Sequence, residues 1–266
     1  MENLLEAKNL SKEYFKTTGF FSRSRTSIKA LDNISVSIKK GITLAVVGES
    51  GSGKSTLAKS LIRLIELDKG SITFKNRNMR AINGSDLKKA RKNIQMIFQD
   101  PYASLNPRMR IIKIMEEPLQ IHDIGNSATQ YTKILSMIKR VGLLEEDLSK
   151  YPHQFSGGQR QRIGIARALI LEPELVICDE PVSALDVSVQ AQIVQLLKSL
   201  QKEFGLTYLF ITHDLRIVRH IADEVIVMKN GKLIEQGKTD IIFRKPKNKY
   251  TKELLASIPG NLSKRK

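Results

Sequence analysis

Short apolar runs alternate with longer amphipathic patterns at both ends of the chain. The apolar runs are rich in β-branched residues and fall at 42–47, 94–98, 175–178, 206–211 and 224–228. Each run is short enough to be a buried strand of a parallel sheet. Helical periodicity occupies 56–67, 160–171 and 189–204 between them, so strand–helix units around one mostly parallel sheet are predicted.

The middle of the chain has a different pattern. From 99 to 156 the strand signals disappear and prolines punctuate the segment. Helical periodicity returns over 131–141, which predicts a mainly helical insertion. After the last apolar run, Asn230-Gly231 is typical of a tight hairpin, so a short antiparallel strand is expected over 232–235.

Composition excludes several classes of protein. With 266 residues, 41% of them hydrophobic and 27% charged, the chain is expected to fold in water and to bury its own core. No apolar run approaches the roughly 20 residues of a membrane span, and Glu2 and Glu6 argue against a signal peptide. The one cysteine, Cys178, excludes an internal disulfide and a cysteine-based metal site.

The charge balance favours an anionic partner. The formal net charge is +17, and residues 244–266 hold eight basic residues against one acid. Such an excess fits a nucleotide, a nucleic acid or an anionic membrane face, and it equally fits a solvated surface that keeps the protein soluble. Charge alone does not choose among these alternatives.

The strongest chemical motif is Gly48-Glu49-Ser50-Gly51-Ser52-Gly53-Lys54-Ser55. It matches the phosphate-loop pattern G-x-x-x-x-G-K-[ST], follows the apolar run 42–47 and opens the helical pattern at Thr56. In such a loop, backbone amides and the helix N-terminus surround phosphates, the lysine reaches the β- and γ-phosphates, and the hydroxyl can ligate Mg²⁺. The motif therefore predicts a nucleoside triphosphate site.

Two further motifs fit phosphoryl transfer. Asp179 and Glu180 end a buried strand pattern, where one acid can hold Mg²⁺ and the other can orient and deprotonate an attacking water. A second glycine-rich turn, Ser156-Gly157-Gly158-Gln159, precedes the helical pattern 160–171 and offers anion donors. Two such elements suggest either convergence within one chain or two chains meeting head to tail.

The order of these motifs resembles that of the ATP-binding cassette ATPases over about 4–259. The loop at 48–55 resembles Walker A, the strand ending at Asp179-Glu180 resembles Walker B, and 156–159 resembles the family signature. Gln99 resembles the Q-loop glutamine, and Ser183-Ala184-Leu185-Asp186 resembles the D-loop. His213 resembles the switch histidine, and Tyr14 resembles the aromatic residue that stacks on adenine.

The resemblance implies how ATP and Mg²⁺ would be bound. Tyr14 would stack on the adenine, although an aromatic in an N-terminal strand can also be a core residue. Gly48 to Thr56 would hold the phosphates. Ser55, Gln99 and Asp179 would arrange Mg²⁺.

The resemblance also implies a catalytic arrangement shared between two chains. Glu180 would be the catalytic base, and His213 would contact the γ-phosphate. Ser156 to Gln159 would act in trans on the ATP of a partner cassette, and Asp186 would lie at the dimer interface. The remaining histidines, His122, His153 and His220, lack metal-ligand spacing and are interpreted as surface or packing residues.

The implied fold class is α/β, a single ABC ATPase cassette over 1–266. It would comprise a RecA-like parallel-sheet core over about 1–98 and 160–235, with N-terminal antiparallel strands. A helical subdomain would span about 99–159, and a C-terminal extension of the oligopeptide-transporter type about 236–266.

Two longer stretches, 99–109 and 151–155, resemble the oligopeptide and dipeptide importer ATPases, in particular their F-type subunit. An insertion at 19–23 and the tail at 250–256 are similar to the same branch. The tail departs from it at Asn248-Lys249, where the branch often has His-Pro, and it lacks clustered cysteines, so no iron–sulfur cluster is expected. Nickel and glutathione importers share these stretches and remain alternatives.

The resemblance implies an importer assembly on the cytoplasmic face of the cell membrane. Its partners would be a second ABC ATPase subunit, with a heterodimer favoured, two transmembrane permease subunits and, indirectly, a solute-binding protein. Residues 102–109 are expected to contact the permease, and the basic surface to meet the anionic leaflet.

Two other kinds of cassette ATPase fit the sequence less well than a peptide importer. A nucleic-acid or ribosome-associated ATPase is disfavoured because the chain has no long coiled-coil insertion, zinc cysteines or second cassette. An exporter is disfavoured because its cassette is often fused to a membrane domain. No nucleic acid is therefore expected as a partner.

Overall fold

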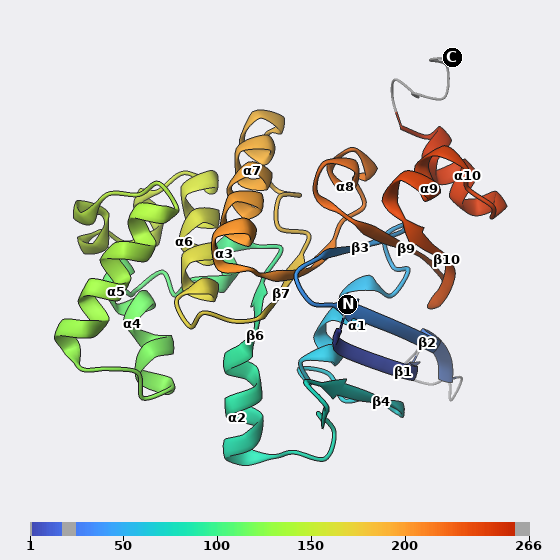
Figure 1. Ribbon diagram of the computed structural model, residues 1–266, viewed down its shortest axis with the longest axis horizontal. Coiled ribbons are helices and arrows are strands. Elements are labelled where there is room, and N and C mark those ends of the chain that lie inside the picture. The colour runs from blue at the N-terminus through green and yellow to red at the C-terminus, as the bar shows by residue number, and fades with distance from the viewer. Residues whose placement is uncertain (1, 18–24, 259–266) are drawn as a thin grey trace. The chain divides into compact units, whose positions relative to one another are not determined.

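The computed structural model describes residues 2–17 and 25–258 (Figure 1). The chain forms two compact units, which we call the first unit (Met1–Ile82 with Leu209–Lys266) and the second unit (Asn83–Tyr208). The predicted insertion at 19–23 lies outside the described residues. The subdomain division predicted from the sequence stays a prediction.

An antiparallel sheet opens the first unit. Its strands are β1 (Asn3–Thr17), β2 (Arg25–Lys39), β4 (Lys69–Phe74) and β5 (Arg77–Asn78), in the order β2-β1-β4-β5. The first three of these strands are labelled in Figure 1. Alternate residues of β2, including Ile34, Val36 and Ile38, are buried, as expected of a sheet with one covered face. Ala7 of β1 pairs with Val36 and also with Ile72 of β4.

The first unit also contains parallel strands that end at the phosphate loop. β3 (Thr43–Val47) is fully buried and pairs in parallel with β9 (Glu224–Lys229), which pairs antiparallel with β10 (Lys232–Lys238). Asn230 and Gly231 have φ values of 48° and 74°, so the predicted hairpin is confirmed. The last strand extends three residues further than expected, to Lys238.

The helices of the first unit are short. They are α1 (Lys54–Leu61), α8 (Leu215–Ile221), α9 (Thr239–Arg244) and α10 (Lys249–Ala256). The pattern over 56–67 predicted a longer α1. The helix ends at Leu61 because Arg63 has a left-handed φ of 54° and the Leu64 N–H donates to the Lys59 carbonyl across it at 2.8 Å.

The second unit is mainly helical, as predicted for the middle of the chain. β6 (Ile94–Ile97) and β7 (Leu175–Asp179) pair in parallel. Its α-helices are α2 (Gly84–Asn93), α3 (Pro101–Ser104), α4 (Ile111–Ile121), α5 (Ser127–Arg140), α6 (Gly157–Leu169) and α7 (Val187–Phe204). Two 3₁₀ turns, Glu145–Ser149 and Pro152–Gln154, precede α6. β8 (Thr207–Ile211) contains the boundary between the units.

The apolar runs of the sequence become buried strands. All five residues of β7 are buried, among them Cys178, the single cysteine of the chain. Burial, reinforced by the charge of Asp179, raises the pKa of the Cys178 thiol, so this side chain behaves as a small apolar group. Within the described ranges, no helix combines the length and the apolar character that a bilayer crossing requires.

Candidate functional site

The phosphate loop has a shape that only glycine permits at two positions. Gly48 and Gly53 have φ values of 153° and 102°. A Cβ at Gly48 would lie 2.2 Å from the Met228 carbonyl oxygen, and one at Gly53 would lie 2.2 Å from the Ala30 carbonyl oxygen. The loop is therefore packed directly against the backbones of β9 and β2.

Lys54 lies folded inside this loop. Its side chain is buried, and its ammonium group donates to the carbonyl oxygens of Gly48 and Glu49, both at 2.8 Å, and to the Ser52 hydroxyl at 3.5 Å. α1 begins at Lys54, and its N-cap, Gly53, has no side chain to cap the first turn. A buried cation and a helix N-terminus thus share one small loop, the combination that attracts a phosphate group.

Two neighbouring segments hold the loop in place. The Gly231 N–H in the β9–β10 turn donates to the Ser52 carbonyl at 3.0 Å. The Glu49 N–H donates to the Tyr250 hydroxyl of α10 at 3.4 Å. Sequence reasoning missed Tyr250 as part of this site, because a contact across 201 positions leaves no local pattern.

The acids at the end of β7 have unequal surroundings. Asp179 is buried as the last residue of the strand, whereas Glu180 lies one residue beyond it with a left-handed φ of 48°. The Ser183 N–H and hydroxyl donate to the Glu180 carbonyl at 3.3 and 3.1 Å, so the turn after β7 is closed. The Gln99 amide nitrogen donates to the Glu180 carboxylate at 3.3 Å. The structure thus brings Gln99 and Glu180 together.

The predicted magnesium ligands are the oxygen donors that this cation prefers. Because the Gln99 nitrogen faces Glu180, its amide oxygen is available as a neutral ligand beside the acids. Asp179 supplies a carboxylate, and Ser55, in the first turn of α1, supplies a hydroxyl. Hydroxyl, amide and carboxylate oxygens together suit Mg²⁺ chemically.

The predicted signature lies at the start of α6. Ser156 is the N-cap, its hydroxyl accepts from the Gln159 N–H at 3.3 Å, and the Gln159 side-chain oxygen accepts from the Ser156 N–H at 2.9 Å. A Cβ at Gly158 would lie 2.6 Å from the Val189 side chain of α7. The signature therefore packs closely on the helix that Asp186 begins as its N-cap.

Two other predicted site residues, Tyr14 and His213, lie in the first unit. The Tyr14 ring on β1 is 41% exposed, so the alternative that it is a core residue is wrong. His213 is exposed just before α8, whose N-cap Asp214 accepts from the Arg216 N–H at 2.9 Å. A hydrogen bond from the Arg216 side chain holds the pKa of Asp214 below its ordinary value. His153 is exposed and stacks on Tyr151 with ring centroids 5.8 Å apart.

Comparison with known proteins identifies the family. A family model described as ABC transporter matches residues 31–183. The chain is 49% identical to the oligopeptide transport ATP-binding protein AppF of Bacillus subtilis (strain 168), over 97% of this chain and 79% of that protein. It is 51% identical to the dipeptide transport ATP-binding protein DppF of Haemophilus influenzae, over 96% of this chain and 78% of that protein.

A solved structure agrees with these relatives. The dimeric post-hydrolysis structure of the ATP-binding cassette MJ0796 bound to ADP and Pi matches with a TM-score of 0.77 and 32% identity, over 88% of this chain and 98% of that chain. The cassette fold and the similarity to oligopeptide and dipeptide importer ATPases, both predicted from the motifs, are confirmed. The chain therefore belongs to the ABC transporter family.

Proposed function

We propose that this protein is the ATP-hydrolysing subunit of an importer that carries dipeptides or oligopeptides across the cytoplasmic membrane. The observation that carries the ATP chemistry is the buried Lys54 inside a loop of glycine-dependent shape. The peptide assignment is supported by relatives about half identical to this chain, whose names specify oligopeptide or dipeptide transport.

ATP binding replaces contacts that the loop makes with itself. The phosphates enter the turn at 48–56, and the Lys54 ammonium exchanges the Gly48 and Glu49 carbonyls for phosphate oxygens. Tyr14, exposed on β1, stacks on the adenine. Ser55, Gln99 and Asp179 would hold Mg²⁺, which when bound would neutralise phosphate charge.

Hydrolysis requires a base that can take a proton from water. Glu180 is suited to this role because its backbone is closed by Ser183 and its carboxylate is oriented by the Gln99 amide. His213 contacts the γ-phosphate and helps to retain it. Gln99 also belongs to the segment that leads into α3. A movement of that segment would therefore alter the orientation of the Glu180 carboxylate.

The signature completes a second cassette's site. Ser156 to Gln159 and the N-terminus of α6 act in trans on the nucleotide of a second ABC ATPase subunit, and Asp186 lies at that interface. ATP favours the closed pair because both chains contact each γ-phosphate, and losing that phosphate removes the bridge. An F-type subunit pairs with a different sister subunit, so the dimer is a heterodimer.

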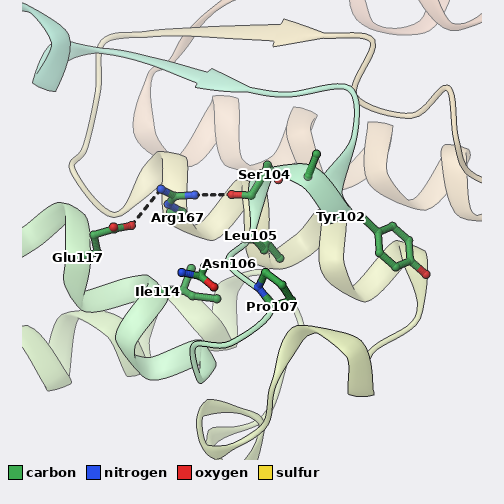
Figure 2. A pocket seen from close by; sticks show the side chains of 9 residues that line it. Tyr102, Ser104, Leu105, Asn106, Pro107, Ile114, Glu117 and Arg167 are labelled. Carbon is green, nitrogen blue, oxygen red and sulfur yellow. Dashed lines mark hydrogen bonds and ion pairs between the residues drawn. The ribbon is translucent and has the colours of Figure 1, made fainter.

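A hollow in the second unit is suited to receive the permease. It has a volume of about 490 Å³ and lies beside α3 within the predicted contact segment (Figure 2). Arg167 lines the hollow and braces it by donating to the Ser104 carbonyl at 2.7 Å and to the Glu117 carboxylate at 3.1 Å. Tyr102, which also lines the hollow, is 64% exposed. The central carbon of the Arg160 guanidinium lies 3.7 Å from the centroid of the Tyr102 ring. A braced hollow with an exposed aromatic edge fits a protruding helix.

The test is to trap the assembly. Tagged Glu180→Gln would be purified from detergent-solubilised cells with ATP and Mg²⁺, and the proteins that accompany it would be identified by mass spectrometry. Two integral permease subunits and a second cassette ATPase are expected, since the variant binds ATP and stalls before hydrolysis. A solute-binding protein encoded beside them would identify the substrate. Recovery of ribosomal proteins or nucleic acid instead would overturn the transport function.

A further inference from the structure

The C-terminal helix α10 approaches the phosphate loop through one side chain. Tyr250 is only 7% exposed, and its ring packs in an apolar cluster with Val47 of β3 and Val227 of β9. Its hydroxyl accepts the Glu49 N–H at 3.4 Å. The ammonium group of Lys229, the last residue of β9, lies 4.1 Å from the centroid of the Tyr250 ring. One aromatic residue thus contacts the core, the end of β9 and the loop.

The contact falls on a residue that Lys54 also holds. The Glu49 carbonyl accepts from the Lys54 ammonium at 2.8 Å, and its N–H donates to the Tyr250 hydroxyl. Both backbone polar groups of Glu49 are therefore engaged by side chains. If Lys54 turns toward a phosphate, the Tyr250 hydroxyl still restrains the Glu49 backbone. The loop can then release its lysine without losing its shape.

The start of α10 is anchored so that Tyr250 is delivered to this position. The Glu235 carboxylate of β10 accepts from the N–H groups of Lys247 and Asn248 at 2.8 and 3.0 Å. The Asn248 side chain in turn accepts from the Tyr250 N–H at 2.9 Å. Burial alone would raise the pKa of Glu235, but the Thr251 side chain and the Lys247 and Asn248 N–H groups keep that pKa below its ordinary value, so the anchor is charged at neutral pH.

Packing explains the ring of Tyr250 but not its hydroxyl. Phenylalanine would fill the same apolar cluster without introducing a buried polar atom. The hydroxyl is directed at a backbone amide of the phosphate loop, where it adds a hydrogen bond and no apolar contact. The feature that needs an explanation is therefore the polar one.

We propose that Tyr250 is a positioning residue of the phosphate loop, through which the C-terminal helix sets the affinity for ATP. The proposal rests on the proposed binding of ATP phosphates by residues 48–56. Tyr250 acts through the Glu49 backbone and does not touch the nucleotide. Removing its hydroxyl is expected to raise the Kd for ATP about two- to twelve-fold, the range of one net hydrogen bond.

The experiment measures ATP affinity and turnover in the full chain. The Kd for ATP would be determined calorimetrically for the wild type and for Tyr250→Phe, with Tyr131→Phe as the matched control. Tyr131 also loses a hydroxyl hydrogen bond, to Glu145 at 2.7 Å, but it lies in α5 of the second unit. A rise in Kd and KM for Tyr250→Phe alone, with kcat little changed, is expected. A purely structural role would lower the melting temperature and leave the Kd unchanged.

Two further variants separate the possible failures. Glu235→Gln weakens the hydrogen bonds that anchor α10 and is expected to raise the Kd for ATP by a smaller factor than Tyr250→Phe. This variant still tests the proposal if Tyr250→Phe folds poorly. Unchanged affinity in both Tyr250→Phe and Glu235→Gln, while Lys54→Ala abolishes binding, would overturn this proposal alone. Unchanged affinity in Lys54→Ala would overturn the phosphate-loop assignment and this proposal with it.

Discussion

Glu180 combines the proposed catalytic role with an unfavourable backbone conformation. Its φ of 48° lies in the left-handed region, where an L-residue with a side chain is less stable by roughly 1–2 kcal/mol. Glycine avoids this penalty but gives the unfolded chain more freedom, which costs about 0.5–1 kcal/mol. Glu180→Gly should therefore be more stable than Glu180→Ala by about 0.5–1 kcal/mol. The two variants lose the same carboxylate and its bond to Gln99, so only the backbone term differs.

The assay compares unfolding with hydrolysis. For a chain of this size the difference corresponds to a melting temperature about 1–3 °C higher for Glu180→Gly, measured by circular dichroism without nucleotide. Phosphate release should be lost in both variants because neither has the base. Lys150 is the control position: its φ of −80° is ordinary, so Lys150→Gly should be less stable than Lys150→Ala because glycine gives the unfolded chain more freedom.

A Glu180→Gly protein that melts at or below Glu180→Ala would refute this reasoning. It would mean that the turn after β7 relaxes in the variants, or that the left-handed conformation carries no strain in this setting. The expected result would instead show stability given up at the position of the catalytic base, which is where strained backbones concentrate in enzymes.

Three further predictions concern the loop, the core and acid stability. Gly53→Ala should abolish ATP binding in calorimetry, because its Cβ would lie 2.2 Å from the Ala30 carbonyl oxygen; retained affinity would contradict the rigid loop. Phe210→Ala, at a fully buried position, should lower the free energy of unfolding, measured in urea, by about 3–5 kcal/mol. A loss below about 1 kcal/mol would contradict the place of Phe210 in the core. The Arg216 hydrogen bond lowers the pKa of Asp214 from 3.8, so its stabilising contribution is present above that pH and is lost as pH falls through the folded-state pKa. Asp214→Asn should therefore be less stable than the wild type at neutral pH, with a difference that vanishes in strong acid; a constant difference would disprove the linkage.

The buried parallel strands were predictable because their signal is local. Each apolar run needs only its own composition to indicate a strand, and β3, β7 and β8 are buried along their whole length. The Asn230-Gly231 turn was predictable for the same reason, since its positive φ values suit these two residues.

The antiparallel strands gave no comparable pattern. β1 changes register against β2 between Ala7 and Leu10 and again between Leu10 and Lys12. Asn9 has a left-handed φ of 54° at the first of these irregularities. Each bulge interrupts the two-residue alternation on which sequence analysis depends, so the strand was expected only from the family resemblance.

The candidate site divides in the same way. The phosphate loop and the acids after β7 are contiguous motifs, and their chemistry could be predicted from residue types and spacing. The contacts that orient them are not contiguous: Gln99 and Glu180 are 81 positions apart, and Glu49 and Tyr250 are 201 apart. Nothing near either residue in the sequence indicates such a partner, because tertiary packing alone brings them together.

Because Cys178 is buried, the native protein is expected not to react with thiol reagents. Cys178 is the single cysteine of the chain, it is fully buried, and its raised pKa keeps it from forming the reactive thiolate. One introduced cysteine on the surface would therefore carry a fluorescent or spin label without background. Val187, 72% exposed and adjacent to Asp186, would place such a probe beside the proposed dimer contact, so that pairing of cassettes could be followed in the otherwise unaltered chain.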